Sequence, residues 1–142
     1  MNSRVFDLLG LLTPFLMILK LLFQELWTRD LDWDQPGIRQ GHVANSWEAW
    51  KHELANVDQI KAPRLLLRNL SSVDNVELHG FGDASERAYG TAVYICAEDK
   101  DVNRISNLVM AKSRVAPVKR ISLPKLKLLG ARITAKLLDY VI

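Results

Sequence analysis

The chain has 142 residues, of which 49% are hydrophobic and 25% are charged, and its mean hydropathy is −0.01. This balance is typical of about one globular domain and excludes an intrinsically disordered tail. The single cysteine, Cys96, cannot form an internal disulfide, which argues against a disulfide-rich secreted scaffold. We therefore expect an intracellular protein, cytoplasmic or nuclear.

Charge is distributed unevenly along the chain. Residues 103–142 hold nine basic side chains and one acidic side chain, a net charge of +8, whereas residues 1–102 are net acidic. A basic stretch of this size favours a polyanionic partner such as nucleic acid, through neutralisation of phosphates and release of counterions. The alternative is a solvated basic face that balances the acidic part of the chain.

The apolar run at residues 8–19 favours a buried helix over a targeting segment. Its 12 residues fall short of the roughly 20 that cross a bilayer, and no small-residue cleavage site follows. Thr13 as the cap and Pro14 at the first helical position predict a helix that continues to Trp27. We expect no membrane partner, although a membrane-anchored protein that uses residues 5–27 remains an alternative.

A second helix is predicted to begin at Ser46, with Trp47 and Trp50 on its apolar face. From Val76 onward the pattern changes to the alternation of strands.

Three strands are expected at residues 76–83, 89–97 and 105–113, joined by short turns into an antiparallel meander. Helical spacing then begins again at Leu126 and continues to the C-terminus. The pattern predicts an α+β fold in which an N-terminal helical segment is followed by a three-stranded antiparallel meander and one helix.

Asp83, in the segment HGFGDASERAYG, is the first candidate for chemistry. An Asp at a strand end, followed by small residues, presents its carboxylate at the rim of a sheet, although such a residue more often satisfies a turn. Two-metal phosphoryl chemistry needs several carboxylates around ions about 3.5 to 4 Å apart, so its partners must come from other elements. Cys96 is interpreted as core packing and His79 as a half-buried strand residue.

Several segments together resemble a known family. ELHGFGDASERAYGTAVY and LVMAKSRVAPVKRISLPKLKLLGA are similar to the ribonuclease H region of the Bel/Pao retrotransposon polyproteins, whose usual form is close to ELHGF-DAS-AYGA-VY followed by AKSRVAP and PRLEL. The segment FDLLGLLTPFLMILKLLFQELW resembles the family's YDPLGLLSP segment, which lies between the reverse transcriptase and the ribonuclease H domain, and DLDWDQP also matches. The resemblance covers almost the whole chain in the family's order.

The resemblance implies a division of the chain into three parts. Residues 1–62 would be a helical connection region that follows a reverse transcriptase, residues 63–75 a linker, and residues 76–142 the N-terminal half of a truncated ribonuclease H-like domain. It also implies that the chain is a fragment of a retrotransposon-derived pol polyprotein whose intact relatives carry reverse transcriptase and ribonuclease H activity. The implied partners are an RNA:DNA hybrid and the remainder of that polyprotein.

The resemblance further assigns metal ligands, and the chain departs from them. In the family the Asp of DAS and the Glu of PRLEL are the first two ligands of Mg²⁺, and a further Asp lies downstream. Asp83 matches the first, as a vestigial catalytic and metal position, whereas Lys127 stands in place of the Glu. This change removes oxygen ligands that Mg²⁺ requires. We therefore expect no functionally bound metal and no catalysis by this chain.

The alternative function is that of a non-catalytic remnant that binds nucleic acid through its basic C-terminal segment. Its candidate contacts, called the basic segment below, are Arg114, Lys119, Arg120, Lys125 and Lys127.

Overall fold

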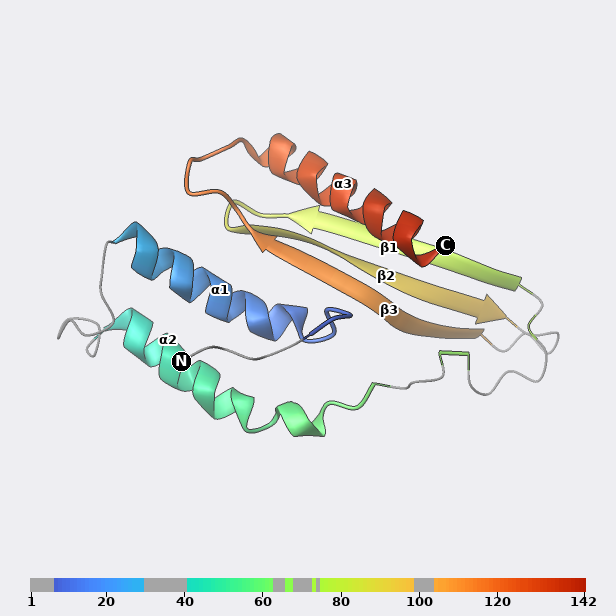
Figure 1. Cartoon of the computed structure of the whole chain (residues 1–142), viewed down its shortest axis with the longest axis horizontal. Coiled ribbons are helices and arrows are strands. Elements are labelled where there is room, and N and C mark those ends of the chain that lie inside the picture. The colour runs from blue at the N-terminus through green and yellow to red at the C-terminus, as the bar shows by residue number, and fades with distance from the viewer. Residues whose placement is uncertain (1–6, 30–40, 63–65, 68–72, 74, 99–103) are drawn as a thin grey trace.

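The computed structural model describes residues 7–29, 41–62, 66–67, 73, 75–98 and 104–142 (Figure 1). The fold of these residues is α+β, as the sequence predicts. The helices are α1 (Thr13–Thr28), α2 (His42–Leu54) and α3 (Leu123–Val141), with a 3-10 turn η2 (Val57–Gln59), and the strands are β1 (Asn75–Ala84), β2 (Ala88–Glu98) and β3 (Arg104–Val115).

The three strands form one antiparallel sheet in the order β1-β2-β3, which confirms the predicted meander (Figure 1). In the first pair Ala84 lies opposite Tyr89, and the second pair contains a register shift between Val93 and Tyr94. Residues directly opposite each other on neighbouring strands point to the same side of a sheet. The register therefore assigns each strand residue to one of two faces.

Glycines allow α3 to lie close against β1. A Cβ added at Gly80 would lie 2.7 Å from Cγ2 of Thr134, and one added at Gly82 would collide with Oγ1 of the same threonine. On the helix side, a Cβ at Gly130 would lie 3.3 Å from the backbone oxygen of Asp83. Gly80 and Gly82 thus point toward α3, and the side of the sheet that they share is called the α3 face; the opposite side is called the far face.

The core of this half of the molecule lies between α3 and β2. Leu126 is only 1% exposed and packs with Tyr89 and Ala116. Leu129 and Ile133 of α3 pack against the same cluster. Burial of these apolar side chains, at about 1.5 to 3 kcal/mol each, is the principal attraction between the helix and the sheet.

Helix α1 lies beside β3, and α2 packs against α1 (Figure 1). The segment just before α1 is attached to β3 by a hydrogen bond of 2.8 Å from the backbone N–H of Ala111 to the backbone oxygen of Leu9. Gly10, at φ 72°, comes so close that an added Cβ would collide with the Ala111 carbonyl. Only glycine combines this left-handed conformation with so close an approach.

Trp50 connects α2 to α1. Its indole Nε1 donates a hydrogen bond of 3.1 Å to the backbone oxygen of Phe15, and the two aromatic rings stack with centroids 4.8 Å apart. Nearby, Leu22 and Leu26 of α1 form a buried cluster with Val43 of α2. The second helix therefore supplies part of the apolar cover that α1 needs.

The predicted cap of α1 is wrong. Leu12, not Thr13, occupies the N-cap position, and its side chain makes no capping hydrogen bond. Instead the carboxylate of Asp7 accepts hydrogen bonds of 2.9 Å from the backbone N–H groups of Leu11 and Leu12. A negative charge at this end of a helix also interacts favourably with the helix dipole.

Two predicted helix starts are also too late. Helix α2 begins at His42 instead of Ser46, and α3 begins at Leu123 instead of Leu126. The proline after Leu123 lies in the first turn of α3, where its missing N–H leaves no hydrogen bond unmade.

The remaining predictions about organisation are only partly covered by the described residues. Most of the predicted linker at 63–75 lies outside them, so the three-part division of the chain remains a prediction. Among the helices that the structure describes, none combines the length and apolar character needed to cross a membrane.

The contact of Gly82 with Thr134 makes a testable prediction. Gly82→Ala should destabilise the fold by about 1 to 3 kcal/mol, because the added methyl group collides with the threonine. Thr134→Ala in the same chain should recover most of that loss, since it removes the colliding atoms. Urea unfolding of the wild type, the two single variants and the double variant measures the coupling. Single losses that simply add in the double variant would contradict the contact.

Candidate functional site

Asp83 lies near the end of β1 and is exposed, with its side chain on the far face. Gly90 is directly opposite on β2, and Ser113 is opposite Gly90 on β3. Thr13 and Met17 of α1 border the same shallow pocket, which has a volume of about 290 Å³. The carboxylate is therefore presented at a rim of the sheet, as the sequence predicts, beside the start of α1.

Lys127 is exposed on the first half of α3. Residues 127, 130 and 134 follow each other at intervals of three and four, so they share one side of the helix. Gly130 and Thr134 on that side contact β1, at the backbone of Asp83 and at the two glycines before it. The structure thus brings the two positions that match the family's first carboxylates to the same end of β1. Within the described residues neither side chain forms an ion pair.

The described residues around Asp83 do not fit a pair of divalent metal ions. No group of three or more His, Cys, Asp or Glu side chains among them is arranged to hold a metal ion. Mg²⁺ takes a near-octahedral shell of oxygen ligands, and Asp83 supplies one carboxylate. An ammonium group at the second position also repels a cation, by about 4 kcal/mol per unit charge at 4 Å and an effective dielectric of about 20.

The five residues of the basic segment do not lie on one surface of the structure. Arg114 is on the α3 face of β3, because its partner Tyr89 packs in the core beneath α3. Lys119 and Arg120 are exposed in the loop before α3. Lys125 and Lys127 are two residues apart on a helix, so they point about 200° apart around its axis.

A second polar cluster lies on the far face, at the other end of the sheet from Asp83. It borders a pocket of about 310 Å³. Nε2 of His79 lies 2.9 Å from Oε2 of Glu77, and this hydrogen bond is the main reason why the pKa of Glu77 is below its ordinary value. The thiol of Cys96 donates to Oγ of Ser106 at 3.4 Å.

The structure tests two interpretations of the sequence at this cluster. Cys96 is only partly buried and lies on the far face with Glu77, so its interpretation as core packing is wrong. The side chain of His79, expected to be half-buried, is 43% exposed. The side chains of Glu77 and His79 are 58% and 43% exposed, so their mutual interaction is weak.

Three exposed basic residues that the sequence analysis did not single out lie on β3 and α3, the two elements that also carry Arg114, Lys125 and Lys127. They are Lys112, Arg132 and Lys136. A signal for them exists in the sequence. Alternation along a strand places residues 112 and 114 on one face, and helical spacing places residues 125, 132 and 136 on one side of a helix. The direction in which that face and that side point follows only from the strand register and the rotation of the helix.

Comparison with known proteins gives one family. A family model described as "Pao retrotransposon-like RNaseH-like domain" matches residues 1–142. No curated protein and no solved structure matches the chain significantly. The match includes the helices α1 and α2 as well as the sheet and α3.

Proposed function

The chain belongs to the family of Pao retrotransposon-like RNaseH-like domains, and we propose that it binds an RNA:DNA hybrid without cutting it. In this proposal it derives from a pol polyprotein whose intact relatives carry reverse transcriptase and ribonuclease H activity. The remainder of that polyprotein is the second partner, and the cytoplasm or nucleus is the place of action. The observation that supports it most is Lys127, an ammonium group on the side of α3 that faces the Asp83 end of β1.

The absence of cleavage follows from ligand counting. Hydrolysis by two metal ions requires carboxylates that hold both ions about 3.5 to 4 Å apart. Asp83 is one such carboxylate, and the position matched to the second is occupied by Lys127. The other acidic side chains that the structure describes do not group with Asp83.

Binding is supported by charge. Residues 103–142 carry a net charge of +8, and every member of the basic segment is exposed. None of the five pairs with a carboxylate among the described residues, so their charges are not neutralised there. Exposed cations of this kind bind phosphates and release counterions, which gives an affinity that falls with salt and is largely independent of sequence.

We expect the wild-type chain not to hydrolyse the RNA strand of a hybrid above background with Mg²⁺ or Mn²⁺. Lys127→Glu alone should not create the activity, because it adds a second carboxylate where the two-metal reaction needs several. Gel analysis of a labelled RNA strand measures cleavage, with Asp83→Asn as the matched control. Metal-dependent cleavage by the wild type that disappears in Asp83→Asn would overturn this part of the proposal.

Charge reversal tests the binding part. Replacing all five residues of the basic segment with Glu should abolish hybrid binding at physiological salt, since it converts five attractions to phosphate into repulsions. Fluorescence anisotropy with a labelled hybrid measures affinity, and circular dichroism checks that the variant is folded. The control carries five Glu substitutions elsewhere, at Lys20, Arg29, Lys51, Lys61 and Arg104. Equal losses in both variants would mean that net charge alone is responsible.

A further inference from the structure

The contacts of α3 fix the rotation of this helix about its own axis. Thr134 and Leu138 lie against Gly80 of β1. Leu129 and Ile133, on another side of the helix, pack beside Tyr89 of β2. One side of α3 is therefore turned toward β1, and the side that carries Leu129 and Ile133 is turned toward β2 and, beyond it, β3.

Three basic residues belong to that second side. Lys125 is four residues before Leu129, Arg132 is three residues after it and Lys136 is seven residues after it, which places all three next to the leucine at helical spacing. All three are exposed. Lys127 belongs to the opposite, β1-facing side and is separate from this row.

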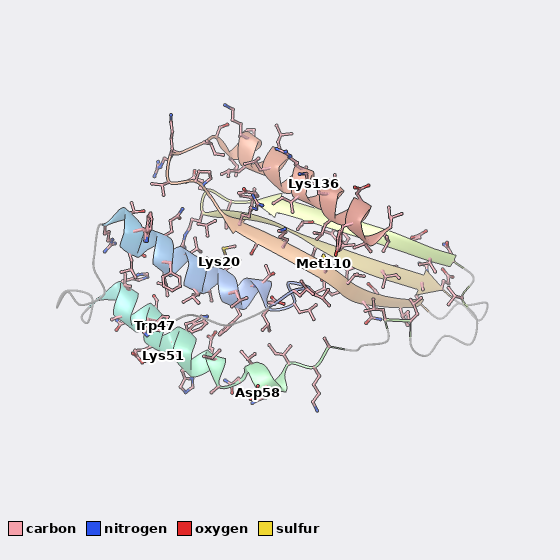
Figure 2. All side chains as sticks on the ribbon, viewed as in Figure 1. Lys20, Trp47, Lys51, Asp58, Met110 and Lys136 are labelled. Atoms are coloured by element: carbon pink, nitrogen blue, oxygen red, sulfur yellow. The ribbon has the colours of Figure 1, made fainter. Side chains whose placement is uncertain are left out.

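Two more basic residues lie on the part of the sheet beside this row. Lys112 is opposite Thr91 and Arg114 is opposite Tyr89, and both partners are buried on the α3 face. Because α3 packs on β1 and β2, it leaves this end of β3 uncovered, and both basic side chains are exposed. Lys136 on α3 and Met110 on β3, labelled in Figure 2, mark the helix and the strand that border this surface.

Together these exposed basic residues, on neighbouring sides of α3 and β3, are called the α3–β3 strip below. Its members are Lys112, Arg114, Lys125, Arg132 and Lys136.

The strip carries five cations with little to balance them. Within the described residues none of the five forms an ion pair. Asp139, the one acidic residue in the last 40 of the sequence, is exposed on α3 three residues after Lys136, so it lies beside the strip and leaves it a net charge of +4. Cations gathered in this way repel one another and are stabilised by a polyanion that displaces their counterions.

The dimensions of the strip fit a phosphate backbone. At 1.5 Å per residue, positions 125 and 136 are about 16 Å apart along the helix axis. Successive phosphates of one nucleic-acid strand advance by about 3.4 Å along the duplex axis, so the strip spans about five phosphates. The three cations of α3 therefore extend along about five phosphates, with Lys112 and Arg114 on the neighbouring strand.

We infer that the α3–β3 strip is the surface that holds the phosphate backbone of bound nucleic acid. This inference rests on the proposed function, and it adds Lys112, Arg132 and Lys136 to the contacts while leaving Lys127 out. Asp83 points to the far face of the sheet, whereas the strip is on the α3 face. A strand held by the strip is thus kept on the other side of the sheet from the carboxylate, and binding needs neither Asp83 nor a divalent metal.

The test removes the three cations that lie outside the basic segment. In the triple variant Lys112→Gln, Arg132→Gln, Lys136→Gln, we expect hybrid affinity to fall at least about tenfold at physiological salt. The slope of log affinity against log salt should become shallower by about 2 to 3, because each lost phosphate contact removes about 0.9 from it on a duplex. Anisotropy titrations at several salt concentrations, without divalent metal, give both quantities.

The matched control is Lys20→Gln, Lys51→Gln, Lys61→Gln, which removes the same charge from exposed positions elsewhere. It should keep the wild-type slope. Equal changes in the two triple variants, or an unchanged slope in the strip variant while the wild type binds, would overturn the inference and leave the proposed function intact. A wild-type chain that fails to bind the hybrid at low salt would instead overturn the proposed function itself.

Discussion

The close approach of α3 to β1 is the constraint on which the rest of the structure depends. Gly80 and Gly82 have no side chains to hold the helix away, and Thr134 occupies the space that they leave. Interiors are packed too densely for such a helix to rotate freely once it is seated. The glycines therefore set both the distance of α3 from the sheet and the direction of each of its side chains, Lys127 included.

Much of the fold was predictable because the strands and the last helix follow from local patterns of apolar and polar residues. The alternation after Val76 predicted three strands in a meander, and helical spacing predicted the last helix, all confirmed by the structure. The errors concern contacts that do not follow from the periodicity of a helix or a strand. The hydrogen bonds of Asp7 at the start of α1 and the seating of Gly10 against Ala111 both depend on how the chain returns on itself.

The candidate site was predictable only in part, for a related reason. Motif comparison selected Asp83 and Lys127, and the structure brings their positions to one end of β1. Sequence alone could not tell that Lys125 and Lys127 belong to different surfaces, because that depends on which side of α3 the sheet covers. Nor could it group Lys112 with Lys136, which needs the register of β3 and the rotation of the helix together.

The central claim is that nucleic acid binds on the α3 face, away from Asp83, and chemical-shift mapping by NMR tests it most directly. An unlabelled RNA:DNA hybrid is added to the ¹⁵N-labelled chain, with and without Mg²⁺. The account predicts that the amide signals of β3 around Lys112 and of α3 around Arg132 and Lys136 shift in both conditions, while those around Asp83 stay in place. Shifts that centre on Asp83 and require Mg²⁺ would contradict it.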